Sequence, residues 1–169
     1  CIKIVAKHTR RGVELPQGEE LRDWIVVSLG DFFDELSLLW GIVLETDMPS
    51  FKTGEGFPAG FEYLWAKGGV SEPRVKPIRC SSTEYVEFSM TWIEEQVSDE
   101  TLIPLENNTP YPENFMIRIK KIFIRMFRIY AIIYTQHFRG VEELGQAANL
   151  NTSFKHLLYF IFEFDLVDQ

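Results

Sequence analysis

The segment from Phe115 to Phe138, FMIRIKKIFIRMFRIYAIIYTQHF, constrains the fold more than any other part of the chain. At about 100° per residue, its apolar side chains gather on one side of a helix, which predicts a long helix packed against a core. The residues of this apolar face are Ile119, Ile122, Phe123, Met126, Phe127, Tyr130, Ile133, Tyr134 and His137. Cations fall on the opposite side, at i,i+3 and i,i+4 spacings that make them surface neighbours. We call them the basic stripe: Arg118, Lys121, Arg125 and Arg128.

The length and composition are those of one folded domain. The 169 residues include 46% hydrophobic and 14% aromatic side chains, which is enough for a single core. We expect an N-terminal arm over residues 1–14 and one domain over 15–169. The net charge of -8 argues against general binding to nucleic acid, whose phosphates attract cationic surfaces, and favours a basic partner.

Cysteine content and hydropathy indicate an intracellular protein. Cys1 and Cys80 are too few for a disulfide framework, and no stretch resembles a signal peptide. The longest apolar run, from Ile122 to Tyr134, contains two arginines and is too short to cross a bilayer. We therefore expect no membrane segment and a cytoplasmic location.

The N-terminal half predicts two helices. Acidic residues that follow the Leu15–Gly18 turn predict a short amphipathic helix, because negative charge stabilises a first helical turn. Ser28 and Asp31 resemble a capping box, and they predict a second, buried helix that ends near Leu44.

The rest of the chain predicts a hairpin and two further helices beside the long one. Segments 61–66 and 74–80 are expected to pair as a small hairpin with a basic return strand. Ser81 and Ser82 can cap a helix from about Thr83 to Val97, and residues 151–153 can cap a last helix from Phe154 to Phe164. The predicted class is mostly α, with a four-helix-bundle core, a small β-hairpin and flanking short helices.

No catalytic signature stands out. His8, His137 and His156 lie in no arrangement that would activate a nucleophile, and structural roles are the favoured interpretation of all three. Neighbouring carboxylates, such as Glu19 and Glu20, point in different directions on a helix and indicate solvated faces. No phosphate loop of the strand–glycine–helix kind occurs. We therefore expect a protein that is not an enzyme.

The basic stripe is the best candidate for a binding site. Arginines one turn apart can bind phosphate oxygens in bidentate fashion, and Lys76 and Arg79 of the return strand could add to them. Spacing alone favours a simpler alternative, in which the stripe is only the solvated face of the helix.

Several longer words in the sequence occur in one order and resemble a known family. They are LPQGEELRDWI, DFFDELSLLWG, FEYLWA, KPIRCSSTEYVEFSMTWIEEQVSDETLIP, FIRMFRIYAIIYTQHF and LNTSFKHLLYFIFEFDLVD. From Leu15 to Asp168 the chain is similar to the Mob (Mps one binder)/phocein family, the non-catalytic coactivators of NDR/LATS-type Ser/Thr kinases. The resemblance implies a four-helix bundle with a hairpin at its side, in agreement with the pattern analysis.

The resemblance also implies partners and places. The basic N-terminal regulatory segment of the kinase would bind at Glu19, Glu20, Asp23 and Trp24. A phosphothreonine peptide of an upstream Hippo-type kinase or scaffold would bind at Arg125 and Arg128, with Lys121, Lys76 and Arg79 nearby. It further implies Hippo and mitotic-exit signalling, and locations that include the nucleus, spindle poles, centrosome and cell cortex. The alternative is a phosphopeptide-binding scaffold that does not activate a kinase.

Two departures from the family pattern limit the resemblance. Members of the family hold a structural zinc with two cysteines after the second helix and two histidines near the end of the long helix. Here the loop from Glu45 to Lys52 reads ETDMPSFK, with Asp47 and Lys52 near the ligand positions, and of the two histidine positions one is Ile132 and the other His137.

Without thiolates a closed tetrahedral site cannot form, so we expect neither zinc nor another cofactor, with Cys80 matching a cysteine that is not a ligand. Packing of Phe51, Phe57 and Phe61 against the Ile132 side is expected to brace the loop instead. The second departure is Ile124, which stands where the family has a lysine of the phosphate cluster. Lys121 is the candidate to replace it.

Overall fold

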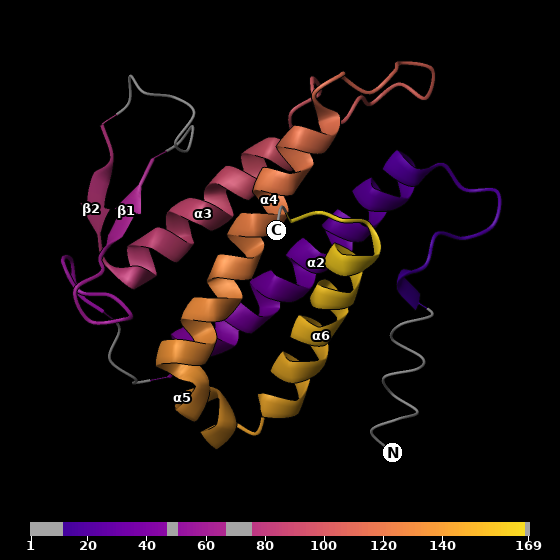
Figure 1. Cartoon of the computed structure of the whole chain (residues 1–169). Helices are drawn as coiled ribbons and strands as arrows, with labels where there is room; N and C mark the ends of the chain where they lie inside the picture. Colours follow the sequence, from indigo (N-terminus) through magenta and orange to yellow (C-terminus); the bar gives the residue numbers. More distant parts are fainter. Residues whose placement is uncertain (1–11, 47–50, 67–75, 168–169) are drawn as a thin grey trace.

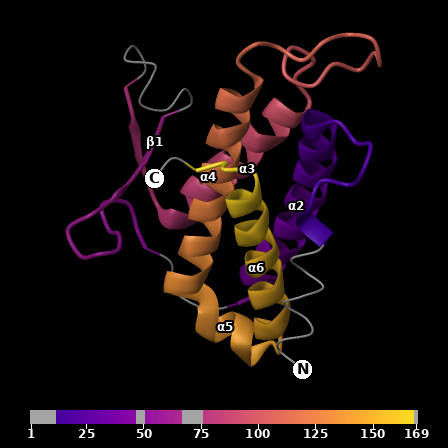
Figure 2. The ribbon, with the colours of Figure 1, turned by 45° about the vertical axis from the view of Figure 1, so that its right-hand side comes forward.

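The computed structural model describes residues 12–46, 51–66 and 76–167. Its helices are α2 (Leu21–Leu44), α3 (Ser82–Val97), α4 (Phe115–Ile132), α5 (Phe138–Glu143) and α6 (Ala147–Glu163), with a π-helical turn η2 (Ile133–His137) between α4 and α5. The strands are β1 (Tyr63–Trp65) and β2 (Ile78–Cys80). The long helices pack side by side, and the hairpin lies at the outer side of α3 (Figures 1 and 2). The mostly α class with one small antiparallel pair is confirmed.

The core is centred on α4, as the apolar face predicted, although Phe127 of that face is 39% exposed. Its side chains from Ile119 to Ile133 that face the bundle are essentially inaccessible to solvent. Phe123 stacks on Phe160 of α6 at 5.6 Å between ring centroids and meets the edge of Phe32 of α2 at 6.1 Å. These ring contacts join three helices at one point, which is the kind of dense aromatic packing that dominates core energetics.

A single helix replaces the two that were expected in the N-terminal half. Helix α2 runs without a break from Leu21 to Leu44, so the predicted boundary at Ser28 and Asp31 is wrong. Ser28 is buried, and Ile25, Leu29 and Phe32 form a continuous apolar row on both sides of that boundary. A cap at Ser28 would have broken this row.

The predicted start of α3 is confirmed, and that of α6 is wrong. Ser81 caps α3, since its hydroxyl accepts from the Glu84 N–H at 3.1 Å and the Glu84 carboxylate accepts from the Ser81 N–H at 3.2 Å. Helix α6 begins at Ala147, so Asn151 and Ser153 lie inside it. Both side chains bond tyrosines of the long helix instead: Asn151 accepts from Tyr134 at 2.6 Å, and Ser153 bonds the buried Tyr130.

The long helix continues past its expected end, but not as a regular α-helix. Its last predicted turn widens into the π-helical turn η2. Helix α5 then continues in sequence to Glu143. No helix in the described ranges is both long enough and apolar enough to span a membrane.

The hairpin forms where it was expected, with shorter strands. Tyr63 pairs with Cys80, Leu64 with Arg79 and Trp65 with Ile78 in antiparallel register. The return strand was expected to begin at Arg74, which lies outside the described residues. Tyr63 and Trp65 point their rings at Tyr85 of α3, at 5.5 and 6.0 Å, and so fix the hairpin on that helix.

Candidate partner-binding surfaces

The start of α2 presents exposed carboxylates. Glu20 is the N-cap, and its side chain accepts from the Asp23 N–H at 3.0 Å and from Arg22 Nε at 2.8 Å. Glu19 is also exposed, one residue ahead of the cap. We call Glu19, Glu20 and Asp23 the acidic end of α2. The helix places them together because its first N–H groups favour negative charge.

The acidic end is held in place by residues from elsewhere in the chain. The hydroxyl of Tyr111, from the α3–α4 connection, donates to Asp23. Burial, together with this bond to a carboxylate, raises the pKa of Tyr111 to about 12. The Arg22 guanidinium lies over the Tyr111 ring, 5.2 Å from its centroid. Trp24 is half-buried and donates through Nε1 to the carbonyl of Val13 at 3.1 Å. The structure therefore brings the expected residues Glu19, Glu20, Asp23 and Trp24 together.

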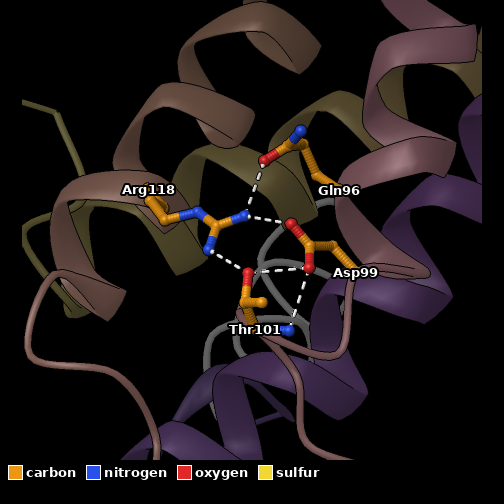
Figure 3. Close-up of polar contacts among 4 residues, drawn as sticks. All are labelled: Gln96, Asp99, Thr101 and Arg118. Atoms are coloured by element: carbon orange, nitrogen blue, oxygen red, sulfur yellow. Dashed lines mark hydrogen bonds and ion pairs between the residues drawn. The ribbon is translucent and has the colours of Figure 1, made fainter.

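The basic stripe does not form one solvent-facing surface. Arg118 is engaged by the end of α3, where it bonds Asp99 Oδ2 at 2.7 Å, Gln96 Oε1 at 3.2 Å and Thr101 Oγ1 at 3.1 Å (Figure 3). Hydrogen bonds from Thr101 and the charge of Arg118 lower the pKa of Asp99 to about 2. Arg118 is thus committed to joining α3 and α4.

Arg125 is buried as well, with 9% of its surface exposed. Its guanidinium lies between two indole rings, 3.9 Å from the Trp92 centroid and 4.4 Å from that of Trp65. Its Nη2 donates to the carbonyl of Ala66 at 2.9 Å, directly after β1. Burial lowers the pKa of this guanidinium. Arg125 therefore fastens the hairpin to α3 and α4, which the sequence-based prediction of a solvated side chain missed.

Arg128 is the member of the stripe that reaches a hollow. It is exposed and lines a pocket of about 500 Å³ between α4 and the hairpin. The other walls are mostly aromatic and aliphatic: Phe57, Phe61, Tyr63, Tyr85 and Ile132. Within the described part of the chain, Arg128 has no carboxylate partner, and Glu62, which also lines the pocket, is paired with Arg79 at 2.7 Å. A cation at the edge of a pocket with aromatic walls can bind an anionic group attached to an apolar one.

The other expected cations are not among the described residues that line this pocket, and Arg79 is joined to it through Glu62. Lys121 and Lys76 are exposed, and Arg79 is exposed although paired. The pocket's aromatic walls were not among the expected site residues. Phe57 and Phe61 were expected to brace the loop by packing, but they are 66% and 65% exposed, so that prediction is wrong for them. Gly56 and Pro58 on either side of Phe57, and Gly60 before Phe61, were the signal that both residues lie on a loop.

The residues of the long helix and the loop do not fit the zinc site that the resemblance implies. His137 is 4% exposed, its ring meets the edge of Trp40 at 5.9 Å, and burial lowers its pKa. Neither ring nitrogen has a hydrogen-bond partner in the described ranges, and no group of three possible ligands occurs there. Ile132 is aliphatic, Lys52 is an exposed cation, and Asp47 lies outside the described residues. The expectation of no zinc stays a prediction.

Comparison with known proteins agrees with this architecture. The model of the Mob1/phocein family matches residues 2–169. The chain is 42% identical over 164 residues to "MOB kinase activator-like 1 homolog A" of Dictyostelium discoideum, covering 95% of this chain and 74% of that protein. It is 45% identical over 162 residues to homolog B of that organism, and 42% identical over 160 residues to "MOB kinase activator-like 1A" of Arabidopsis thaliana, with 95% of this chain and 73% of each relative covered. These names describe activators of kinases rather than enzymes, in agreement with the expected non-enzymatic role. The chain belongs to the Mob1/phocein family.

Proposed function

We propose that this protein is a non-catalytic kinase coactivator that binds the basic N-terminal regulatory segment of an NDR/LATS-type Ser/Thr kinase. The observation that carries the proposal is the acidic end of α2, where Glu19, Glu20 and Asp23 are exposed together. The names of the relatives, MOB kinase activator-like proteins, supply the class of partner.

The surroundings of these carboxylates favour a basic peptide. Asp23 is already oriented by Tyr111, so it loses little freedom when a cation binds it. The half-buried ring of Trp24 and the ring of Tyr111 offer apolar surface beside the charges. Lysine and arginine side chains match such a site because their stems are apolar and their ends are charged.

A charge-reversed double variant tests this surface. Glu19→Lys with Asp23→Lys is titrated against a fluorescent peptide of the kinase segment, and the affinity is expected to fall about tenfold or more. Glu87→Lys with Glu94→Lys, two exposed carboxylates of α3, is the control with the same change in net charge. Unchanged affinity in the first variant would show that the surface is wrong. An equal loss of affinity in both double variants would show that the peptide is attracted by the net charge of the protein and not by this surface.

We further propose that the pocket at Arg128 binds a phosphothreonine peptide of an upstream Hippo-type kinase or scaffold. Arg128 supplies the cation that lines the pocket, and a bound peptide that extends beyond it could also contact the exposed cations Lys121, Lys76 and Arg79. Arg125 contributes by positioning the hairpin wall rather than from the surface, because it is enclosed by Trp65 and Trp92.

The pocket alone would be enough for the alternative function, a phosphopeptide-binding scaffold that does not activate a kinase. The pocket adjoins β1 and α4, whereas the acidic end of α2 adjoins the α3–α4 connection, so the two can act separately. Titration with phosphorylated and unphosphorylated peptides, each against wild type and Arg128→Ala, tests the pocket. A kinase assay with and without the chain then separates the two functions: no rise in kinase activity, with phosphopeptide binding intact, favours the scaffold.

A further inference from the structure

A polar cluster joins four separate segments at the end of the long helix. It consists of Gln136 in η2, Ser82 at the start of α3, Phe51 in the loop after α2, and Tyr63 in β1. We call it the Gln136 cluster. The Phe51 N–H donates to Gln136 Oε1 at 2.9 Å and to Ser82 Oγ at 3.1 Å. The Ser82 hydroxyl donates to Gln136 Oε1 at 2.8 Å, and Gln136 Nε2 donates to the Tyr63 hydroxyl at 3.1 Å.

Both backbone polar groups of Phe51 take part in the cluster. The Ser82 N–H donates to the carbonyl of Phe51 at 3.0 Å, so Phe51 both gives and receives a bond at the start of α3. The ring of Phe51 also lies nearly parallel to that of Tyr63, at 6.4 Å between centroids. Ser82 is fully buried, and a buried hydroxyl that lost its partners would be costly. The cluster therefore specifies one position for Phe51.

We propose that the Gln136 cluster holds the loop after α2 against the end of the long helix and thereby does the work that a structural metal would do between those two segments. Two observations carry this. Among the described residues, no group of side chains near His137 could hold a metal, and His137 packs against Trp40 of α2 instead. The same two segments are nevertheless joined directly, because the Phe51 N–H donates to Oε1 of Gln136, the residue before His137.

The proposal makes the fold independent of metal. Protein purified without added zinc and analysed for elements is expected to hold far less than one zinc per chain. Its melting temperature is expected to be the same with EDTA, without EDTA and after addition of zinc. One zinc per chain, or a melting temperature that falls with EDTA, would overturn the proposal.

Variants test the cluster itself. Gln136→Leu and Ser82→Ala are each expected to lower the melting temperature by about 4 to 10 °C, because each leaves buried polar groups without partners. The matched controls are Gln146→Leu and Ser37→Ala. In the described ranges, the Gln146 side chain accepts a local bond from Asn149, and the Ser37 hydroxyl bonds the Phe33 carbonyl within its own helix. Melting temperatures that match those of the controls would show that the cluster does not hold the loop.

Amide hydrogen exchange in the unmodified protein tests the Gln136 cluster even if a variant fails to fold. The Phe51 amide is expected to exchange much more slowly than that of Thr53, an exposed residue of the same loop. Equal exchange at the two amides would overturn the proposal. None of these measurements depends on kinase or phosphopeptide binding.

Discussion

Replacing Arg125 tests whether this arginine is structural, with Arg125→Ala as the main variant. The side chain loses two stacking contacts, each worth about 0.5–2 kcal/mol for a desolvated guanidinium, and a charged hydrogen bond worth about 1.5–3 kcal/mol. Removing a buried charge also recovers part of its desolvation cost. The free energy of unfolding is therefore expected to fall by about 2–4 kcal/mol.

The assay is urea unfolding followed by far-UV circular dichroism, with two further replacements that divide the effect. Arg125→Met keeps the length of the stem and removes the charge, so it should lose most of the stacking and all of the bond to Ala66. Arg125→Lys keeps a charge but not the planar guanidinium, and is expected to lie between Met and wild type.

Arg128→Ala is the control for this series, since Arg128 is exposed and its removal should change stability by less than about 0.5 kcal/mol. The reasoning is refuted if Arg125→Ala and Arg125→Met both unfold within about 0.5 kcal/mol of wild type. Phosphopeptide affinity should fall in both the Arg125 and the Arg128 variants, but only the Arg125 variants should also lose stability. Loss of affinity alone at Arg125 would instead support direct contact with phosphate.

Two further predictions concern α3 and its ends. The pKa of Asp99 is about 2 in the folded protein, below its ordinary value of 3.8, so its bonds contribute stability that is complete above about pH 4 and is lost as the pH falls toward 2. The urea midpoint of wild type should therefore approach that of Asp99→Asn over this range, and a constant difference between the two would contradict the assignment. Ser81→Ala removes the hydroxyl of the capping box and should cost about 1 kcal/mol in the same unfolding assay, whereas Ser98→Ala at the other end of the helix should cost little.

The sequence predicted a structural feature correctly where the interacting residues are close together in the chain, and failed where the partners lie on another helix. The capping box of α3 was predictable because Ser81 and Glu84 recognise each other within one turn. The pattern at Ser28 and Asp31 looked similar, but whether it caps or continues a helix depends on the apolar row with which α2 packs. Asn151 and Ser153 were misassigned for the same reason, since their partners are tyrosines on another helix.

The candidate site shows the same division. Helical spacing correctly placed the cations of the basic stripe near one another. It could not show that Arg118 bonds Asp99, or that Arg125 lies between two indoles and bonds Ala66, 59 residues away along the chain. Two arginines match the family's phosphate contacts. Arg125 is buried, whereas Arg128 is exposed at the pocket. The π-helical turn left no recognisable mark in the sequence.

That turn, η2, sets a limit on how the chain can change in length. A π-helical turn accommodates one residue more than an α-helical turn would. Ahead of it, α4 presents Arg125 and Arg128 to the hairpin, and within it the successive residues Gln136 and His137 face the hairpin side and α2. Deleting one residue from 133–137 would therefore let this part of the chain revert to regular α geometry, with the residues before and after it still on their present faces. The same deletion within α4 would instead rotate everything after it by about 100° and exchange the packing partners of the C-terminal part of the bundle.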